Sequence, residues 1–234
     1  MTEVLFLHFT THSLFCLFWL GTAPLYAGQA DQIARIGAPS PYLLTAPHDG
    51  FDLHTGEIVE RTCAGLFPRW GCVVATGYRK RQTPINVNRP TEGIDVAHHQ
   101  EAHTQRAQDI YAQYLRAVES LSLRPDWYVE IHGNARPKSS FHMEIACSNV
   151  TEETAQKIKT SWTRLLQIHG LSEFTLLIEP LDEIYFGAES TKIHGSLDRF
   201  KPALHIELPK ALRFEKREQV IGFLREALPY LEKF

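Results

Sequence analysis

The stretch PYLLTAPHDGFDLHTGE, residues 41–57, joins an apolar run to a cluster of polar side chains. Its first part, residues 41–48, is mostly apolar, and such a short run predicts a buried β-strand. At and after the end of this run come His48, Asp49, Asp52, His54 and Glu57. Ligands of open α/β sheets bind at the carboxyl ends of the strands. The stretch therefore indicates a metal or ligand site, although a surface loop can gather such residues by chance.

The rest of the chain alternates between strand-like and helix-like patterns. Helical spacing of apolar residues is clear in Ile58, Val59, Cys63 and Leu66, after a Thr and acidic residues that favour a helix start. In order, the first half of the chain predicts a strand at 41–48, a helix at 55–67, a strand at 70–78, a helix at 98–122 and a strand at 126–134. This order is typical of an α/β protein with a mostly parallel sheet.

The second half interrupts the alternation. It predicts a strand at 139–148, a helix at 151–170, a strand at 174–180, a strand within 201–213 and a last helix at 216–233. Residues 28–40 are polar and irregular, so we expect a loop there. We find no internal repeat, and a length of 234 residues favours one domain, which we place at 28–234.

The composition is that of an ordinary globular protein, with 44% hydrophobic and 22% charged residues. The formal net charge is −3 and no long basic run occurs, which argues against binding of nucleic acid. Twelve histidines is a high count for this length and is a weak hint of metal chemistry.

Residues 1–27 differ from the rest of the chain. They contain a stretch rich in Leu and Phe, followed by small residues near Ala27, as in a secretory signal peptide. The first four residues carry no Lys or Arg, so an uncleaved anchor and a misplaced start codon are the alternatives. The apolar stretch is short for a spanning helix. We therefore expect an exported protein, periplasmic or secreted, whose mature chain has no stable membrane span.

Three cysteines remain after cleavage of such a signal: Cys63, Cys72 and Cys147. At most one disulfide can form within the chain, and Cys63 with Cys72 is a possible pair that the spacing does not demand. The sequence has no CxxC motif, so we do not expect a zinc site made of thiolates.

Two histidines, His48 and His132, stand at predicted strand ends, and each is followed by a glycine within two residues. A lone histidine in such a place is more often structural. Two on neighbouring strands, beside glycines that let the backbone turn sharply, favour a shared site. Imidazole suits zinc, and a carboxylate as third ligand would leave one position open for water. Asp52 is the candidate for that carboxylate, and Glu57 is the competing one.

Two carboxylates are candidates for supporting the ligands, and two for the chemistry. Asp49 could orient a histidine, and Glu130 could orient His132, which lies two residues further along the same strand. Glu207 stands in the apolar run ALHIELP, and glutamate is rarely buried without a partner. It is our candidate for a general base that takes a proton from water, with Glu144 as second choice.

Asn88 and Arg89 lie in a loop bounded by prolines. A guanidinium can hold a carboxylate through two parallel hydrogen bonds, which fixes the orientation of a substrate. Taken alone, an arginine in such a loop is more often an ordinary surface residue.

The motifs PHDG, INVNRP, EIHGN and LHIELP, in this order, resemble the N-formylglutamate amidohydrolase family. The resemblance covers roughly residues 41–230, and its motifs are specific in combination rather than singly. That family is similar in fold to zinc carboxypeptidases, which implies a three-layer α/β/α sandwich with a mixed, mostly parallel sheet and one zinc ion per chain. The chain departs from the family pattern at Glu130 and Gly133, where the family has Asp and Ser, and in an inserted strand–helix–strand at 139–180.

The resemblance also implies a role for each matching residue. The implied zinc ligands are His48, Asp52 and His132, the residues that bind the substrate carboxylate are Asn88 and Arg89, and the general base is Glu207. The loop position of Lys192 and His194 suggests that one of them donates a hydrogen bond to the developing oxyanion.

We therefore predict a zinc-dependent amidohydrolase, or a carboxypeptidase-like peptidase, that acts on an N-acyl amino acid or peptide with a free carboxylate. Histidine with carboxylate also suits other divalent ions. An exported amidase of cell-wall or other peptides is an alternative. A non-catalytic binding module would not need a buried base, and in a purely structural domain the strand-end residues would not converge.

Overall fold

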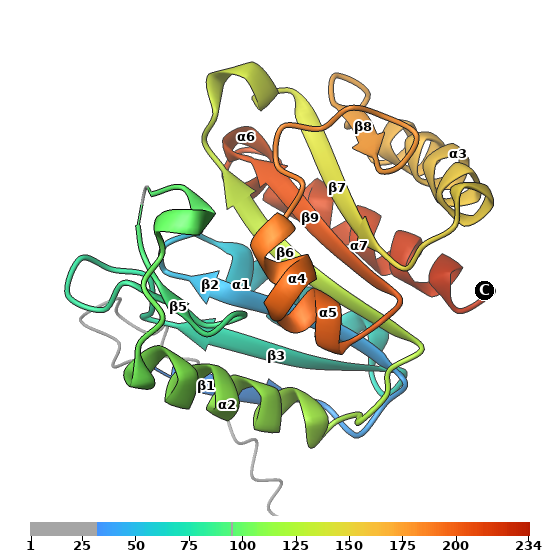
Figure 1. The fold of residues 1–234 in the computed structure, drawn as a ribbon. Coiled ribbons are helices and arrows are strands. Elements are labelled where there is room, and N and C mark those ends of the chain that lie inside the picture. The colour runs from blue at the N-terminus through green and yellow to red at the C-terminus, as the bar shows by residue number, and fades with distance from the viewer. Residues whose placement is uncertain (1–31, 95) are drawn as a thin grey trace, which may run out of the picture.

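The computed structural model describes residues 32–94 and 96–234, and the proposed signal segment 1–27 lies outside them. A seven-stranded sheet forms the centre of the fold, with strand order β1-β3-β2-β6-β9-β7-β8 (Figure 1). Its strands are β1 (Gln32–Ile36), β2 (Tyr42–Asp49), β3 (Trp70–Thr76), β6 (Trp127–Asn134), β7 (His142–Ser148), β8 (Thr175–Ile178) and β9 (Ala203–Pro209). A separate two-stranded ladder joins β4 (Ile85–Asn86) to β5 (Thr91–Glu92).

The middle of the sheet is parallel. Strands β3, β2, β6 and β9 run in one direction, while β1 and β7 pair antiparallel with β3 and β9. Strand β8 is parallel to β7 at the other edge. The mixed, mostly parallel sheet that the sequence predicts is therefore confirmed.

Helices cover both faces of the sheet. The helices are α1 (Thr55–Leu66), α2 (Gln105–Glu119), α3 (Glu152–Ile168), α4 (Glu189–His194), α5 (Ser196–Arg199), α6 (Lys210–Arg213) and α7 (Arg217–Leu231), with 3₁₀ turns at His98–Gln100 and Pro137–Ser139. One apolar core lies between the sheet and α1, α3 and α7, and a second lies between the sheet and α2 and α5. In Figure 1, α2, α4 and α5 lie in front of the sheet and α7 behind it. This is the expected three-layer sandwich.

Strand β2 shows why the centre is buried on both faces. Leu43 points into the core beneath α2, while Leu44 and Ala46 point into the core beneath α1. Alternate residues of a strand face opposite sides, so a strand between two helix layers is apolar throughout. The apolar run of the opening stretch therefore becomes a central strand of the parallel core.

Several segments differ from the sequence prediction. Residues 32–36, expected in a loop, form β1, an edge strand that pairs with β3 alone among the described strands and exposes Gln32 and Arg35. The helix expected at 98–122 begins only at Gln105, because the Thr104 hydroxyl accepts a hydrogen bond from the Ala107 amide and caps the helix there. The short helices α4 and α5 were not predicted.

The segment 139–180 belongs to the same sheet. Strand β7 lies between β9 and β8, so the strand–helix–strand adds two strands at one edge and α3 over one face. Cys63 of α1 and Cys72 of β3 form a disulfide, which confirms the possible pair. Within the described ranges, no helix is long and apolar enough to cross a membrane.

Candidate metal centre

Three neighbouring parallel strands, β2, β6 and β9, have their carboxyl ends on the same side of the sheet. His48 lies at the end of β2, His132 near the end of β6, and Glu207 near the end of β9. Residue pairing between the strands places His132 opposite Glu207. The structure therefore brings together these side chains, which are far apart in the sequence.

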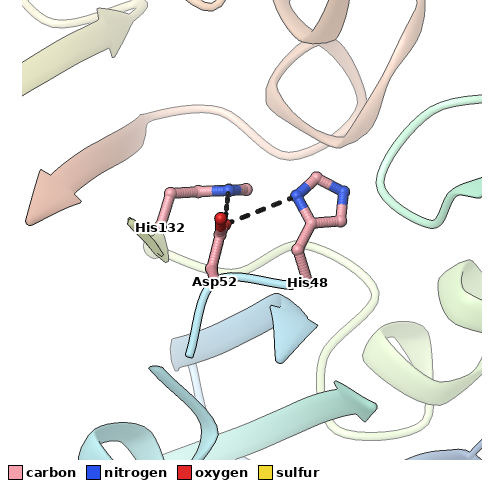
Figure 2. Close-up of side chains that lie close together, drawn as sticks. All are labelled: His48, Asp52 and His132. Carbon is pink, nitrogen blue, oxygen red and sulfur yellow. Dashed lines mark ion pairs between the residues drawn. The ribbon is translucent and has the colours of Figure 1, made fainter. Parts of the chain in front are cut away.

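Asp52 lies between the two histidines, with its carboxylate facing both rings (Figure 2). Its Oδ2 atom is 3.8 Å from Nδ1 of His48 and 3.3 Å from Nδ1 of His132. The two ring centroids are 4.9 Å apart, and all three residues are buried. One potential ligand atom from each residue lies within 4.8 Å of the others, so the three can surround one ion.

A tight turn after β2 places Asp52 beside His48. The backbone amides of Phe51 and Asp52 both donate to the carbonyl oxygen of His48. Gly50, in this turn, has φ of 91°, a conformation that residues with a Cβ rarely adopt. The glycine after the first histidine is therefore needed to return the chain toward the site.

The donor set fits a divalent metal ion. Two imidazoles and one carboxylate form several catalytic zinc sites, in which a fourth position stays open. On both histidines the ring nitrogen nearest to the Asp52 carboxylate is Nδ1, so two imidazole nitrogens and a carboxylate oxygen face one another at one place. Zinc and other divalent ions that accept imidazole and carboxylate suit this donor set.

Burial has the largest influence on the protonation of all three side chains. It lowers the pKa of His48 to about 3, against the opposing contact with Asp52, so this ring is neutral at neutral pH. Burial would also lower the pKa of His132, but hydrogen bonds with Asp52 and Glu130 raise it to about 9. Burial would raise the pKa of Asp52, but its hydrogen bonds with His132 and His48 lower that pKa below its ordinary value. The carboxylate is therefore ionised and able to bind a cation.

Glu130 is a fully buried carboxylate that contacts His132 at Nε2, the ring nitrogen that does not face Asp52. Its Oε2 atom is 3.0 Å from Nε2 of His132, so the predicted contact is confirmed. Its other partners are the Asn88 amide, a ring nitrogen of His205 and the hydroxyls of Tyr128 and Ser196. The group Glu130, His132 and His205 is also compact enough to hold an ion. Because the carboxylate already has five side-chain partners, we interpret it as support for His132 instead.

Asp49 does not orient a histidine, contrary to our expectation. Its Oδ1 atom accepts a hydrogen bond from the backbone amide of Gly56, and its Oδ2 atom accepts one from the Thr76 hydroxyl. These contacts tie the first turn of α1 to the end of β3. Asp49 therefore stabilises the elements around the site.

Glu57, the competing candidate for the acidic ligand, lies in a different network. Its carboxylate is 3.4 Å from Arg61 and 3.2 Å from Arg217, and it is also near His54. The side chain is 30% exposed, whereas that of Asp52 is 5% exposed. The geometry therefore favours Asp52 as the carboxylate of the metal group.

Glu207 and Glu144 lie side by side on paired strands, and Arg136 contacts both. Glu207 is also 3.0 Å from Nε2 of His205. Burial would raise the pKa of Glu207, but the contacts with His205, His132 and Arg136 lower it. Glu207 is therefore ionised, as a general base must be, and it lies one strand nearer to His132 than Glu144 does.

Asn88 and Arg89 are buried and have partners within the protein. The Asn88 amide donates to Glu130 at 2.9 Å. The guanidinium of Arg89 contacts both oxygens of Glu101, at 2.9 Å and 2.5 Å. Arg89 therefore already holds a carboxylate of its own chain, in the geometry that we expected for a substrate.

Arg79 is a site residue that sequence reasoning missed. Its Nη1 atom is 3.4 Å from Nδ1 of His48, and its guanidinium stacks on the Phe51 ring at 4.5 Å. Its buried Nε atom has no hydrogen-bond partner among the described residues. Arg79 lines a cavity of about 330 Å³ together with Arg89, Glu101 and residues 185–191. The available signal was the basic run RKR at 79–81, in the loop after β3 and on the same side of the sheet as the candidate ligands.

Lys192 and His194 lie on α4 and have other partners. The ammonium of Lys192 is 2.5 Å from the carboxylate of Glu179, which also accepts a hydrogen bond from the Cys147 amide. His194 is 3.4 Å from the Ser190 hydroxyl. The contact of Lys192 ties α4 to the segment that follows β8, so its predicted role toward an oxyanion gains no support from this geometry.

Comparisons with known proteins agree with this architecture. No family model matches the chain, and no curated protein matches it. Among solved structures, a carboxypeptidase A from Shewanella denitrificans superposes with a TM-score of 0.51 at 13% identity, over 88% of this chain and 62% of that one. The product Atu2144 from Agrobacterium tumefaciens gives 0.50 at 12% identity, over 86% and 93%. The zinc-free form of YndL gives 0.49 at 14% identity, over 87% and 89%.

Identities this low show the fold alone. The chain has a carboxypeptidase-like α/β fold, and it spans less than two thirds of the Shewanella protein. The narrower resemblance to N-formylglutamate amidohydrolases stays a prediction, since no family model matches.

Proposed function

We propose that this protein is a metal-dependent hydrolase that cleaves an amide bond in a substrate with a free carboxylate, such as an N-acyl amino acid or a peptide. One observation carries the proposal: His48, Asp52 and His132 form a buried group of metal-ligand type, with ionised Glu207 on the adjacent strand. The carboxypeptidase-like fold supports the same class of chemistry. The three residues would hold one ion per chain, for which we propose zinc.

The side chains around this group have separate roles in our proposal. Zinc in such a set supplies Lewis-acid polarisation of a carbonyl and activation of water near neutral pH. Glu207 accepts a proton from the attacking water and later gives it to the leaving amine. His205 and Arg136 contact its two oxygens and hold the carboxylate in place.

We assign the binding of the substrate carboxylate to Arg79 and the cavity that it lines. Among the described residues, no carboxylate forms an ion pair with Arg79, whereas Arg89 is paired with Glu101. Arg79 also contacts His48, so a carboxylate held there lies near the metal ligands. In this assignment, Asn88 and Arg89 hold the carboxylates of Glu130 and Glu101, and they are not the residues that bind the substrate carboxylate.

Metal content is the first test of the proposal. We expect about one zinc per chain in purified wild type, and loss of that zinc in His48→Ala. Glu57→Gln is the matched control and should keep its zinc, because Glu57 lies in the outer ion-pair network. Wild-type protein that takes up no zinc or other divalent ion after reconstitution would rule out the mechanism and favour a non-catalytic binding module.

Hydrolysis of N-acyl amino acids and short peptides is the second test. Glu207→Gln should lower kcat by a factor of about 10² to 10⁴ with unchanged zinc content, because it removes the general base. Glu144→Gln tests the neighbouring carboxylate in the same assay and should have a much smaller effect. The opposite ranking of the two variants would assign the base to Glu144.

A second candidate is an exported amidase that acts on cell-wall or other peptides. The disulfide between Cys63 and Cys72 supports export, because disulfides persist in oxidising compartments such as the periplasm. Fractionation of cells that express the full chain, with mass analysis of its N-terminus, tests this. Recovery in the cytoplasm with the N-terminal segment intact would contradict export.

A further inference from the structure

The guanidinium of Arg213 lies buried near the carboxyl ends of β6 and β9. Arg213 is the last residue of α6, which follows β9 directly, and it is only 5% exposed. Each of its nitrogens donates to a backbone carbonyl: Nε to Leu208 at 3.1 Å, Nη1 to Leu53 at 2.7 Å and Nη2 to Asn134 at 3.2 Å. One side chain therefore links three segments that are distant in the sequence.

Each of these carbonyls belongs to a residue close to the candidate site. Leu53 directly follows Asp52, Leu208 directly follows Glu207, and Asn134 comes two residues after His132. The guanidinium is a rigid plane whose donors have fixed directions. The distances between the three carbonyls, and so between the segments that carry the site, are therefore set by one rigid group.

The partners of Arg213 are carbonyl oxygens and not carboxylates. An arginine buried for charge pairing alone would face an acidic side chain. Burial lowers the pKa of Arg213, while the charges of Asp52 and Glu207 oppose this. Its contacts are therefore those of a connector between backbone segments, located close to two acidic residues of the site.

Gly133 provides the space for this guanidinium. A Cβ atom at residue 133 would lie 2.5 Å from Cζ and 2.6 Å from Nε of Arg213. These distances are too short for any contact between carbon and nitrogen atoms that are not bonded. Arg213 cannot move aside at low cost, because it is buried and its three hydrogen bonds would be lost. A glycine between His132 and Asn134 is therefore required if Arg213 is to reach its partners.

We propose that Arg213 is a positioning residue that sets the spacing of Asp52, His132 and Glu207, and that Gly133 is present to admit it. The proposal rests on the function proposed above. It adds that the metal centre depends on a side chain that contacts neither the ion nor the substrate. A purely structural arginine would affect unfolding without changing the geometry of the ligands.

The test measures the metal site directly, with Zn²⁺ and Co²⁺ as probes. Zinc affinity comes from competition with a chelator, and the Co²⁺ absorption spectrum reports the coordination geometry. We expect Arg213→Lys and Gly133→Ala to fold, to bind zinc about 10- to 100-fold more weakly and to show a changed Co²⁺ spectrum. Lysine keeps the charge but cannot reach three carbonyls, so it should not restore the affinity.

Gly65→Ala is the matched control. Gly65 also packs against an arginine, with its Cβ position 2.3 Å from Nε of Arg225. Arg225 is exposed and donates to the Arg61 carbonyl of α1, and none of its partners among the described residues belongs to the candidate site, so it can move aside. We expect wild-type zinc affinity and an unchanged Co²⁺ spectrum for this variant.

The double variant Arg213→Ala with Gly133→Ala tests the link between the two residues. Once the guanidinium is gone, the added methyl group has space, so its effect should vanish and the two changes should not be additive. Additive effects, or Arg213→Lys and Gly133→Ala with wild-type zinc affinity and Co²⁺ spectrum, would overturn the proposal. Wild type that binds neither ion would instead overturn the proposed function itself.

Discussion

Arg79 and Arg89 line the same cavity beside the proposed metal ligands, but their surroundings differ. Arg89 donates two hydrogen bonds to the carboxylate of Glu101 and has a side chain that is 7% exposed. Arg79 contacts the neutral ring of His48 and the face of Phe51. At the scale of single residues, these two arginines of one cavity differ in that Arg89 has an internal carboxylate partner and Arg79 has none among the described residues.

Substitution of each arginine should therefore have a different effect. Arg79→Gln is expected to lower kcat/KM for carboxylate-bearing substrates about 10- to 100-fold, the cost of a charge-assisted hydrogen bond, with little change in stability. Arg89→Gln is expected to lower the free energy of unfolding by roughly 3 kcal/mol, because the Glu101 side chain, which is 4% exposed, loses its charged partner and keeps only the hydrogen bond from Thr91. Steady-state kinetics and urea unfolding of both variants measure this. Equal loss of stability in the two would contradict the assignment.

The ion pair of Arg89 also predicts a dependence of stability on pH. Burial would raise the pKa of Glu101, but the hydrogen bonds from Arg89 outweigh it and lower this pKa. A carboxylate with a lowered folded-state pKa stabilises the protein above its unfolded pKa, about 4.3, and this contribution is lost as the pH falls through the folded value. The stability difference between wild type and Glu101→Gln should therefore shrink in acid. Urea unfolding from pH 7 down to pH 3 measures it, and a constant difference would contradict the pairing.

The candidate site could be predicted only in part. His48, His132 and Glu207 were accessible from the sequence, because each stands at the end of an apolar run and parallel strands end at one edge. The partner of Arg89 was not accessible, since Glu101 falls within the helix expected at 98–122, whereas α2 begins only at Gln105. Arg79 was not accessible either, because its contact with His48 depends on the path of the loop after β3.

At the scale of elements, the disulfide joins the last part of α1 to the first part of β3. Cys63 and Cys72 are nine positions apart, so the bond closes a short loop. We expect Cys63→Ala with Cys72→Ala to lower the free energy of unfolding by about 2–3 kcal/mol, as the chain-entropy model gives for loops of this size. Zinc content should not change, because the ligands come from other segments. Identical unfolding curves with and without reductant for wild type would show that the bond does not form.

The elements were predicted unevenly, and burial explains why. Central strands and α1 follow strong apolar patterns that the sequence displays. Strand β1 was taken for a loop, because an edge strand has a single neighbour and tolerates polar side chains. The helices α4 and α5 are too short for a recognisable helical period, although α5 adds Leu197 to the core beneath α2.

At the scale of the whole molecule, metal binding and folding should be coupled. The three proposed ligands come from β2, the turn after it and β6, so they are in place only when the sheet has formed. Zinc at a free concentration of 100 times its Kd should add about 2.7 kcal/mol to the free energy of unfolding of the metal-free protein. His132→Ala should show no such gain. Urea unfolding with and without zinc measures this, and equal stabilisation of both proteins would place the ion elsewhere.

The carboxylate of Glu130 has a consequence for anyone who wishes to transfer this centre to another protein. Five side chains from four separate parts of the chain converge on its two oxygens. A graft of His48, Asp52 and His132 alone would leave the second ring nitrogen of His132 without its partner. Replacing Glu130 by Asp would retract the carboxylate by one methylene and draw it away from several donors together. The transferable unit is therefore this carboxylate with its whole ring of donors, and engineering that changes one member has to redesign the others.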